Sequence, residues 1–477
     1  MRNYMKFYIG GEWVEPESAR TLDVINPATE KTAGKISLGG ADDVDSAVKA
    51  ARKAFESWSQ TSIDERVAMV MKIADIYKKR ASEIGAAITE EMGAPAWLAG
   101  GPQAMSAVGH LMTAVDAIKT FRFGEDKGGS HILKEPLGVC GFITPWNWPM
   151  NQLAAKFAPA VLTGNTIVHK PSEIAPFSSY LFAEVLDEAG LPAGVYNLVN
   201  GDGPTVGVAI SAHPDIDMVS FTGSTRAGVE VARAAAASVK RVHQELGGKS
   251  PNIILEDADL EAAVTGSVAT LMMNSGQSCL APTRMIAPKS KMEEVIEIAR
   301  KAVQDWTPGD PATAKMGPVV SEAQWNKIQG LIEKGAAEGA TIIAGGPGKP
   351  EGLETGYYVK PTIFADVTND MTIARQEIFG PVLVIIGYDT EDEAIRIAND
   401  TEYGLAGYVQ SGDIDHARKV ASKIRAGYIN INNSQMDFSV PFGGYKRSGN
   451  GREFGEHAFD EFLELKSVLG YNPSAAA

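Results

Sequence analysis

Cys279 is the side chain in this sequence whose surroundings point most directly to chemistry. It is one of two cysteines and lies in the stretch MMNSGQSCLAP, residues 272–282. A structural cysteine usually sits among apolar residues and packs like a small hydrophobic group. Residues 274–278 are instead small or polar and indicate an exposed turn that contains glycine. We therefore interpret Cys279 as a nucleophile, which needs a lowered thiol pKa or a nearby base.

Glu245 is the preferred candidate for that base. It begins ELGGKSP, residues 245–251, in which two glycines allow the backbone to approach another group closely. A carboxyl group in a partly dry turn can have its pKa raised towards neutrality, which suits a general base; the alternative is a solvated loop carboxylate. Histidine is the more usual partner, but none lies in a signature for that role, and His243, in RVHQEL, is expected to pack or to face solvent.

Asn147 is a candidate donor to an oxyanion. It lies in TPWNWPM, residues 144–150, where two prolines and two tryptophans stiffen the turn after the apolar run VCGFIT. A rigid amide donor suits an oxygen that becomes negatively charged during a reaction. The alternative is that Asn147 caps the helix that follows.

Three turns could contact a dinucleotide. HKPSE (169–173) ends a predicted strand with a lysine and has a glutamate three residues on, while NGDGPTVG (200–207) and FTGSTRAG (221–228) each join a strand to a helix. The start of a helix suits phosphate. The glycines at 201, 203 and 207 have the spacing G-x-G-x-x-x-G rather than G-x-G-x-x-G, however, and most such turns are only tight turns.

Composition argues against several other classes of protein. The 477 residues are 44% hydrophobic and 22% charged, as in globular proteins, and leave room for two or three domains. The net charge of −15 argues against a nucleic-acid partner. No apolar segment has the length of a membrane span or of a secretion signal, so we expect no membrane association. Two unpaired cysteines suit the reducing cytoplasm. The sequence contains neither CxxC nor HExxH, so we expect no metal site.

The apolar pattern predicts an α/β protein. Two amphipathic helices, near 41–57 and 63–80, follow a β-rich opening. From residue 137 short apolar runs alternate with helical stretches, which predicts βαβ units and a parallel sheet. The alternation begins again after GGKSP (247–251), so we expect a second α/β domain, with a hinge near 245–250. The predicted strands of the first unit are 139–144, 165–170, 195–199 and 217–221, and its helices are 152–163, 175–189, 204–212 and 225–237.

Eight motifs together resemble the aldehyde dehydrogenase superfamily in their order and spacing. They are PWN, KPSE, FTGS, ELGGKSP, GQSC, EIFGPV (377–382), NDTEYGLA (399–406) and PFGGYKRSG (441–449). The resemblance runs from INPATE (25–30) to LELKSV (463–468), nearly the whole chain. It implies an enzyme of the non-acylating type, which oxidises an aldehyde to a carboxylic acid with NAD or NADP.

The same resemblance implies a domain organisation. A Rossmann-like cofactor domain would span 1–115 and 137–247, and an α/β catalytic domain 248–447. Residues 116–136 and 448–477 would form a small β oligomerisation flap and a C-terminal strand, which join subunits into a homodimer or homotetramer. The unusual cofactor sheet of such enzymes also accounts for the missing glycine fingerprint.

Residue roles follow from the resemblance position by position. Cys279 becomes the nucleophile, Glu245 the base that activates water, and Asn147 the oxyanion donor, paired with the backbone N–H of Cys279. Glu453 matches a carboxylate that relays protons, and Lys156 joins the predicted catalytic set. The predicted cofactor contacts are Trp146, Lys170, Glu173, Gly203, Gly207, Phe221, Gly223, Ser224, Leu246, Glu377 and Phe379.

The substrate pocket and the choice of cofactor are the finer expectations. Gln152 and Ala155 stand where many similar enzymes carry a larger apolar or aromatic group, which favours a wide, partly polar tunnel. Glu173 would repel a 2′-phosphate, so NAD is expected over NADP, although the charge of Lys170 acts against this preference. The predicted pocket residues are Trp148, Gln152, Ser278, Leu280, Met436 and Phe442.

Other activities fit parts of the pattern. A coenzyme A-acylating dehydrogenase often lacks the general-base glutamate, so Glu245 argues against it. A cysteine esterase would leave KPSE and EIFGPV without a purpose. A non-catalytic protein on the same scaffold would not need Cys279, Glu245 and Asn147 together.

Overall fold

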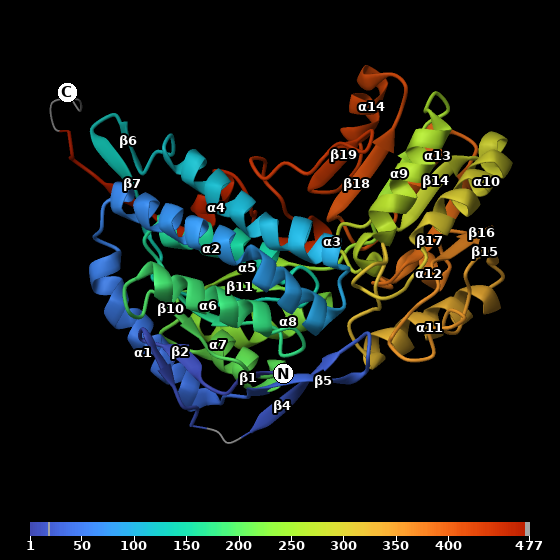
Figure 1. Cartoon of the computed structure of the whole chain (residues 1–477). Helices are drawn as coiled ribbons and strands as arrows, with labels where there is room; N and C mark the ends of the chain where they lie inside the picture. The colour runs from blue at the N-terminus through green and yellow to red at the C-terminus, as the bar shows by residue number, and fades with distance from the viewer. Residues whose placement is uncertain (18–19, 473–477) are drawn as a thin grey trace.

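Two large β-sheets with their covering helices make up most of the molecule (Figure 1). The computed structural model describes residues 1–17 and 20–472. The N-terminal half, blue to green, lies beside the C-terminal half, yellow to red. The predicted α/β fold is confirmed.

The first sheet has a parallel centre. Its strands β12, β11, β8, β9 and β10 run parallel to their neighbours, and every residue of β8, β9, β10 and β11 is buried, as expected of strands covered on both faces. In spatial order the eight strands are β20 (Gly449–Asn450), β12 (Arg241–Glu245), β11 (Met218–Thr222), β8 (Val139–Ile143), β9 (Thr166–Lys170), β10 (Tyr196–Leu198), β2 (Phe7–Ile9) and β3 (Glu12–Val14).

The second sheet repeats this plan with one antiparallel edge strand. In spatial order its seven strands are β15 (Thr341–Ala344), β16 (Thr362–Ala365), β17 (Val382–Tyr388), β14 (Arg284–Pro288), β13 (Pro251–Ile254), β18 (Ala406–Gln410) and β19 (Tyr428–Ile431). All neighbours except β15 and β16 are parallel. The chain passes from the first sheet to the second between β12 and β13, which is where the predicted domain boundary at residue 247 falls.

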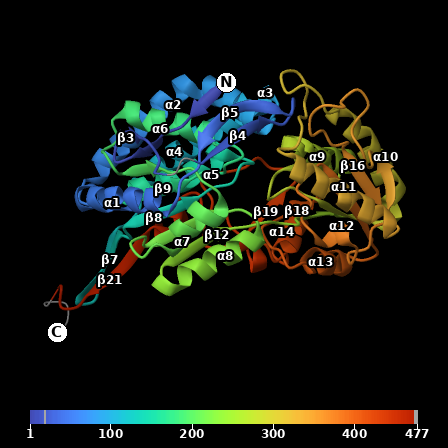
Figure 2. The same cartoon turned by 90° about the horizontal axis from the view of Figure 1, so that it is seen from below.

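Two three-stranded sheets lie at the periphery. One contains β1 (Arg2–Tyr4), β5 (Lys31–Ser37) and β4 (Thr21–Asn26); the other contains β21 (Leu463–Val468), β7 (Ser130–Pro136) and β6 (Gly124–Lys127). Figure 2 shows β7 and β21 extending away from the body as an arm. Strands β6, β7 and β21 fall in the two segments predicted as the oligomerisation flap and C-terminal strand. β20, in the second of these segments, instead pairs with the first sheet. The last five residues of that segment lie outside the described residues.

The helices surround both sheets. α2 starts after a capping box at Ser62, runs beyond the predicted residue 80 and ends where Gly93 adopts a φ of 77°. No helix in the described part of the chain is long and apolar enough to cross a membrane. The helices are α1 (Ala41–Trp58), α2 (Ile63–Met92), α3 (Ala96–Leu98), α4 (Ala104–Ile118), α5 (Pro149–Leu162), α6 (Phe177–Ala189), α7 (Val208–Ala212), α8 (Thr225–Ala235), α9 (Leu260–Met272), α10 (Met292–Ala302), α11 (Glu322–Ala337), α12 (Thr372–Arg375), α13 (Glu391–Asn399), α14 (Ile414–Ala421) and α15 (His457–Glu461).

The carboxyl edge of the first sheet faces the amino edge of the second. Glu245 ends β12 and Lys170 ends β9, whereas Cys279 lies in the loop that leads into β14. The two sides are joined directly, because Asn147, after β8, hydrogen-bonds to the loop before Cys279. The predicted catalytic residues therefore lie between the sheets.

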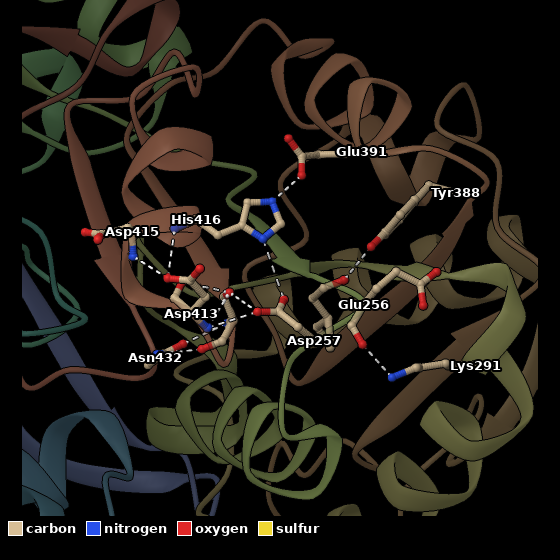
Figure 3. Close-up of polar contacts among 11 residues, drawn as sticks. Glu256, Asp257, Lys291, Tyr388, Glu391, Asp413, Asp415, His416 and Asn432 are labelled. Carbon is tan, nitrogen blue, oxygen red and sulfur yellow. Dashed lines mark hydrogen bonds and ion pairs between the residues drawn. The ribbon is translucent and has the colours of Figure 1, made fainter.

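The opposite, carboxyl edge of the second sheet carries a separate polar group of residues (Figure 3). We call it the outer cluster and define it as Asp257, Glu391, Ser411, Asp413 and His416. Nε2 of His416 lies 2.5 Å from a carboxylate oxygen of Glu391, and Asp257 accepts hydrogen bonds from the Ser411 hydroxyl (2.7 Å) and the Asp413 backbone (2.9 Å). These bonds tie the loops after β13, β17 and β18 together. Within residues 1–17 and 20–472, no three His, Cys, Asp or Glu side chains are arranged to hold a metal ion.

Candidate active site

The loop between α9 and β14 holds Cys279 in a constrained backbone. Asn274, Ser275 and Gly276 have φ values of 55°, 56° and 73°, in the left-handed region that residues with a side chain rarely adopt. A Cβ on Gly276 would lie 2.0 Å from the carbonyl oxygen of Gly380. Glycine is therefore required at this point for the loop to pack against its neighbour.

The prediction of an exposed turn around Cys279 is wrong. Asn274, Ser275 and Gln277 are buried, because their polar groups are used inside the protein. Nε2 of Gln277 donates to the carbonyl oxygen of Asn274 (3.1 Å), and its Oε1 accepts from the backbone N–H of Val320 (2.9 Å). Cys279 itself is half-buried.

The environment of Cys279 favours the protonated form of its thiol. Burial raises the pKa of the Cys279 thiol, and the carboxyl groups of Glu245, Glu377 and Glu453 raise it further. The thiolate is the reactive form of cysteine. A reaction at Cys279 therefore needs either a base or a bound positive charge.

Asn147 belongs to the same hydrogen-bonded unit as the Cys279 loop. Its Nδ2 donates to the carbonyl oxygen of Gln277 (3.1 Å), and its own carbonyl oxygen accepts from Nδ2 of Asn274 (2.8 Å). Nε1 of Trp148 donates to the Ser278 hydroxyl (2.8 Å). The alternative role as a helix cap is excluded, because the N-cap of α5 is Trp148 and no side chain caps that end.

Glu245 is a buried carboxyl group without a hydrogen bond among the described residues. It is 3% exposed, and neither carboxyl oxygen has a partner, so the alternative of a solvated loop carboxylate is wrong. Burial raises the pKa of Glu245 well above its usual value, and repulsion from Glu453 adds to this, while Lys156 and Arg452 act in the opposite direction. A raised pKa is the direction that suits a carboxylate acting as a general base.

The two glycines after Leu246 admit two other parts of the site. A Cβ on Gly247 would lie 2.3 Å from a carboxyl oxygen of Glu377, and one on Gly248 would lie 2.4 Å from the carbonyl oxygen of Cys279. The backbone N–H of Gly248 donates to Glu377 (2.8 Å). The close approach that the glycines allow therefore links Glu377, the Cys279 loop and the end of β12.

Lys156 and Glu453 form a buried ion pair beside Glu245. Their nitrogen and oxygen are 2.5 Å apart, and their side chains are 0% and 4% exposed. Lys156, on α5, also donates to the hydroxyl of Ser220 on β11 (3.0 Å). Two backbone hydrogen bonds with Phe442 hold Glu453 in place (2.8 and 2.7 Å). The predicted catalytic residues Cys279, Glu245, Asn147, Glu453 and Lys156 thus occupy one region.

The predicted cofactor residues fall into two groups. Lys170 ends β9 and donates to Glu173 (3.0 Å) and to the carbonyl oxygen of Pro171 (2.8 Å). Nearer to Cys279, the rings of Trp146 and Phe379 meet edge to face with centroids 5.5 Å apart. Burial raises the pKa of Glu377.

Other predicted cofactor residues lie in or beside the turns that follow β10 and β11. Ser224 is exposed and caps α8 by accepting from the N–H of Ala227 (3.3 Å). The space beside Gly203 is open, because a Cβ there would meet no atom within 4 Å. A Cβ on Gly207 would come within 4.0 Å only of the Lys170 side chain. A Cβ on Gly223, in contrast, would lie 2.6 Å from the ring of Phe221. Phe221 and Leu246 are buried in the apolar core of the first sheet.

On the other side of Cys279 the surroundings are apolar. The wide, partly polar tunnel stays a prediction; at Ala155, Phe442 and Phe454 stack with ring centroids 5.1 Å apart. Of the other predicted pocket residues, Gln152 is buried, whereas Met436 is 41% exposed. The side chains that pack together here with Cys279 are Ala155, Leu280, Leu405, Tyr428, Phe438, Phe442 and Phe454.

Three neighbours of the site are missing from the sequence prediction. The ring of His110, on α4, packs on Phe438 and Phe454 with centroids 4.2 and 4.6 Å away. His243 lies beside Glu245, and Lys249 is buried with no partner for its Nζ among the described residues. The position of His243 two residues before Glu245 on a predicted strand was the one available signal, because such residues share a face.

Fold and site define a two-sheet α/β enzyme with a cysteine held between the sheets. The chain belongs to the aldehyde dehydrogenase family, whose model, described as "Aldehyde dehydrogenase family", matches residues 13–468. The resemblance in the sequence is thus confirmed at the level of the family.

Close relatives cover the chain from end to end. It is 55% identical to a 3-succinoylsemialdehyde-pyridine dehydrogenase from Pseudomonas sp, over 99% of this chain and 100% of that protein. A crystal structure of a cysteine-to-alanine mutant of aldehyde dehydrogenase C from Pseudomonas syringae, with NAD+ and octanal, matches with a TM-score of 0.98 and 51% identity, over 98% of this chain and 97% of the other. A betaine aldehyde dehydrogenase mutant from Staphylococcus aureus, with NAD+, matches with a TM-score of 0.95 and 37% identity, over 98% and 96%.

Proposed function

We propose that this enzyme oxidises an aldehyde to its carboxylic acid with NAD+, through covalent intermediates on Cys279. The observation that carries the proposal is the convergence of Cys279 and Asn147, from two loops joined by three hydrogen bonds, with Glu245 at the end of β12. A base and an amide donor beside a cysteine are what acyl chemistry at a carbonyl carbon requires.

The residues on the cofactor side fit a dinucleotide. Glu173, held by Lys170, offers carboxylate oxygens to ribose hydroxyls, and Glu377 offers the same chemistry nearer to Cys279. Gly203 leaves open space, and the N-terminus of α8 begins at the exposed Ser224, which suits phosphate. When bound, NAD+ would supply a hydride acceptor.

The chain's own groups would carry the remaining steps. The Cys279 sulfur loses its proton to water and adds to the carbonyl carbon. The amide of Asn147 donates to the oxygen that becomes negative, which is worth about 3 kcal/mol for one such donor. After oxidation a thioester remains on Cys279. Glu245 then removes a proton from water, which attacks the thioester, so that the acid leaves and the sulfur is restored.

The apolar side chains around Cys279 favour an uncharged, apolar or aromatic aldehyde. The rings of Phe438, Phe442 and Phe454 contact one another beside Cys279. Burying aldehyde carbons there would release water from apolar surface, at about 25 cal/mol per Å². A relative named for a pyridine semialdehyde and a structure with bound octanal support this class.

Cofactor choice, assembly and location complete the proposal. The carboxylate of Glu173 would repel a 2′-phosphate, and Lys170 already pairs with that carboxylate, so we expect a higher kcat/KM with NAD than with NADP.

The projecting arm of β6, β7 and β21, with Leu465 70% exposed, supports a homodimer or homotetramer. The two unpaired cysteines support a cytoplasmic location.

One experiment separates this function from its alternatives. The purified enzyme is mixed with NAD+ and either octanal, benzaldehyde or succinic semialdehyde, and the absorbance of the reduced cofactor is followed. We expect turnover without coenzyme A, faster with the first two aldehydes. Turnover that requires coenzyme A would indicate an acylating enzyme, and hydrolysis of nitrophenyl esters with no oxidation of any aldehyde would indicate an esterase.

A further inference from the structure

His243 is a buried histidine beside Glu245 that the steps above do not use. It precedes Glu245 by two residues on β12, so both side chains lie on the same face of the sheet. Its side chain is 2% exposed, and its Nε2 lies 3.8 Å from Oε1 of Glu245. Among the described residues, neither this nitrogen nor either carboxyl oxygen has a hydrogen-bond partner. Buried polar atoms normally have one, so this facing set calls for an explanation.

The other ring nitrogen of His243 is already engaged. Nδ1 lies 3.3 Å from the hydroxyl of Ser220, the residue directly opposite His243 on β11. That hydroxyl oxygen also accepts from Lys156 (3.0 Å), which pairs with Glu453. A hydrogen on Nδ1 can therefore be donated to Ser220, which leaves the lone pair of Nε2 directed towards Glu245.

The ring also borders a second carboxyl group. A Cβ on Gly451 would lie 2.9 Å from Nε2 of His243 and 3.0 Å from a carboxyl oxygen of Glu461. That Cβ would also lie 2.3 Å from Cδ2 of His243, so glycine is required at this position for the imidazole ring and the Glu461 carboxyl group to pack against the same backbone. Glu461 is half-buried and accepts from the backbone N–H of Arg452 (2.9 Å). His243 thus stands between Glu245 and a carboxyl group closer to solvent.

We propose that His243 receives the proton that Glu245 takes from water and passes it on to Glu461, an inference that rests on the proposed role of Glu245. Water forms a C–O bond to the acyl carbon and gives one proton to Glu245, while the other leaves with the acid. The C–S bond breaks and Cys279 departs as thiolate. The proton then moves from Glu245 to Nε2 of His243, and through Glu461 to solvent, which restores the Glu245 carboxylate. His243 touches no reacting atom and is a positioning residue for this step.

The charges around His243 favour the second transfer of this path, from His243 to Glu461, and make His243 only a transient carrier of the proton. Burial lowers the pKa of His243 well below its usual value, and Lys156 on α5, Arg452 in the C-terminal segment and Arg241 on its own strand lower it further. Glu245 and Glu461 face it with carboxyl groups whose pKa values burial raises. A neutral imidazole against a protonated carboxyl group is the pairing in which that O–H donates to Nε2. His243 would then release a proton to Glu461 readily rather than retain it.

The test measures decay of the acyl-enzyme directly, so that it does not depend on which step limits turnover. The enzyme is acylated with a nitrophenyl ester, and the acyl-enzyme remaining is quantified by acid quenching from pH 6 to 9. In His243→Gln, which retains a hydrogen-bonding amide but carries no proton, we expect the acylation burst to stay within about twofold and deacylation to slow about tenfold or more. In His243→Ala, added imidazole should restore part of the rate. His416→Gln, in the outer cluster, is the matched control and should match the parent enzyme.

Two results would overturn the proposal. Deacylation in His243→Gln within twofold of the parent across the pH range would show that the proton leaves by another route. A parallel loss of acylation and deacylation, without rescue by imidazole in His243→Ala, would show that the histidine only supports the fold. The proposed function would fail separately, if the parent formed no acyl-enzyme or if Glu245→Gln deacylated at the parent rate.

Discussion

Two groups of carboxylates, each with a histidine, lie in very different surroundings in this enzyme. The outer cluster, around His416, sits at the carboxyl edge of the second sheet (Figure 3). The inner cluster, which we define as Ser220, His243, Glu245, Lys156 and Glu453, sits between the sheets. His416 and Glu391 are 37% and 36% exposed and 2.5 Å apart, whereas His243 and Glu245 are buried, and their facing polar atoms have no hydrogen-bond partner among the described residues.

The contrast shows that proximity of a histidine and a carboxylate does not itself mark a site. In the outer cluster the carboxylate oxygens of Asp257 accept from Ser411 and Asp413, so the group is used to hold three loops together. In the inner cluster Nε2 of His243 and both carboxyl oxygens of Glu245 are removed from water without a hydrogen-bond partner among the described residues. Removal from water is what shifts a pKa far enough for acid–base chemistry.

The position of the site follows from how the sheets meet. A ligand in an open α/β sheet usually binds at the carboxyl ends of the strands, and the first sheet follows that rule. In the second sheet the site lies at the amino ends, because that edge faces the first sheet, and its carboxyl edge carries the outer cluster instead.

The largest effect expected from breaking the inner site comes from Cys279. Cys279→Ala should lower the oxidation of aldehydes on the order of 10⁴-fold or more, since loss of a nucleophile removes a whole covalent path. The measurement is formation of reduced cofactor at saturating NAD+ and octanal. Cys140→Ala is the control, because Cys140 is buried in β8, and it should retain activity. Near-native turnover by Cys279→Ala would refute the assignment.

Glu245→Gln should separate the two halves of the reaction. Without a base for water, deacylation should fall on the order of 10²-fold or more, while the first transfer of hydride proceeds. A stopped-flow mix with NAD+ and aldehyde should therefore show a burst near one equivalent of reduced cofactor per site, followed by slow turnover. A slowed burst that recovers at higher pH would mean that Glu245 also deprotonates Cys279, whose thiol pKa burial raises. Unimpaired turnover would contradict both roles.

The sequence predicted the loops of the site better than their environment. Cys279, Glu245 and Asn147 could be proposed because each lies in or beside a stretch with glycine or proline, whose backbone demands are local. The exposure of the Cys279 turn was mispredicted, because polar residues such as Gln277 are buried here by satisfying one another. Hydrogen bonding of that kind depends on the backbone path, which composition does not reveal.

Contacts between distant segments were out of reach of local patterns. Phe454 and His110 meet beside Ala155, but nothing in their neighbouring residues signals it. For the fold, the parallel strands and most helices could be predicted because burial and helix period are local. The return of the C-terminal segment as β20 beside β12 could not, because only two residues pair.

A smaller effect concerns stability and its dependence on pH. Burial raises the pKa of Glu245 in the folded enzyme, so the folded state holds this proton more tightly than the unfolded state does. The stability that this bound proton contributes is fully present below the unfolded pKa of about 4.3 and is lost as the pH rises through the folded pKa. Between the two pKa values, the loss is about 1.4 kcal/mol for each unit of pH. Glu245→Gln should therefore melt at a higher temperature than the parent at pH 8.5, by a margin that shrinks at pH 5.5. An equal margin at both pH values would mean that the carboxyl group is not desolvated.

The smallest effect is expected in the outer cluster. His416→Gln removes a half-exposed contact with Glu391, and such surface pairs contribute about 0.2–1 kcal/mol, screened further by salt. Urea unfolding should show that loss, a double-mutant cycle with Glu391→Gln should assign it to the pair, and the kcat of aldehyde oxidation should not change. The contrast between the clusters depends on this result. A loss of activity in His416→Gln would show that the two edges of the second sheet are coupled, and that a fully bonded, half-exposed cluster can be as functional as a buried, unpaired one.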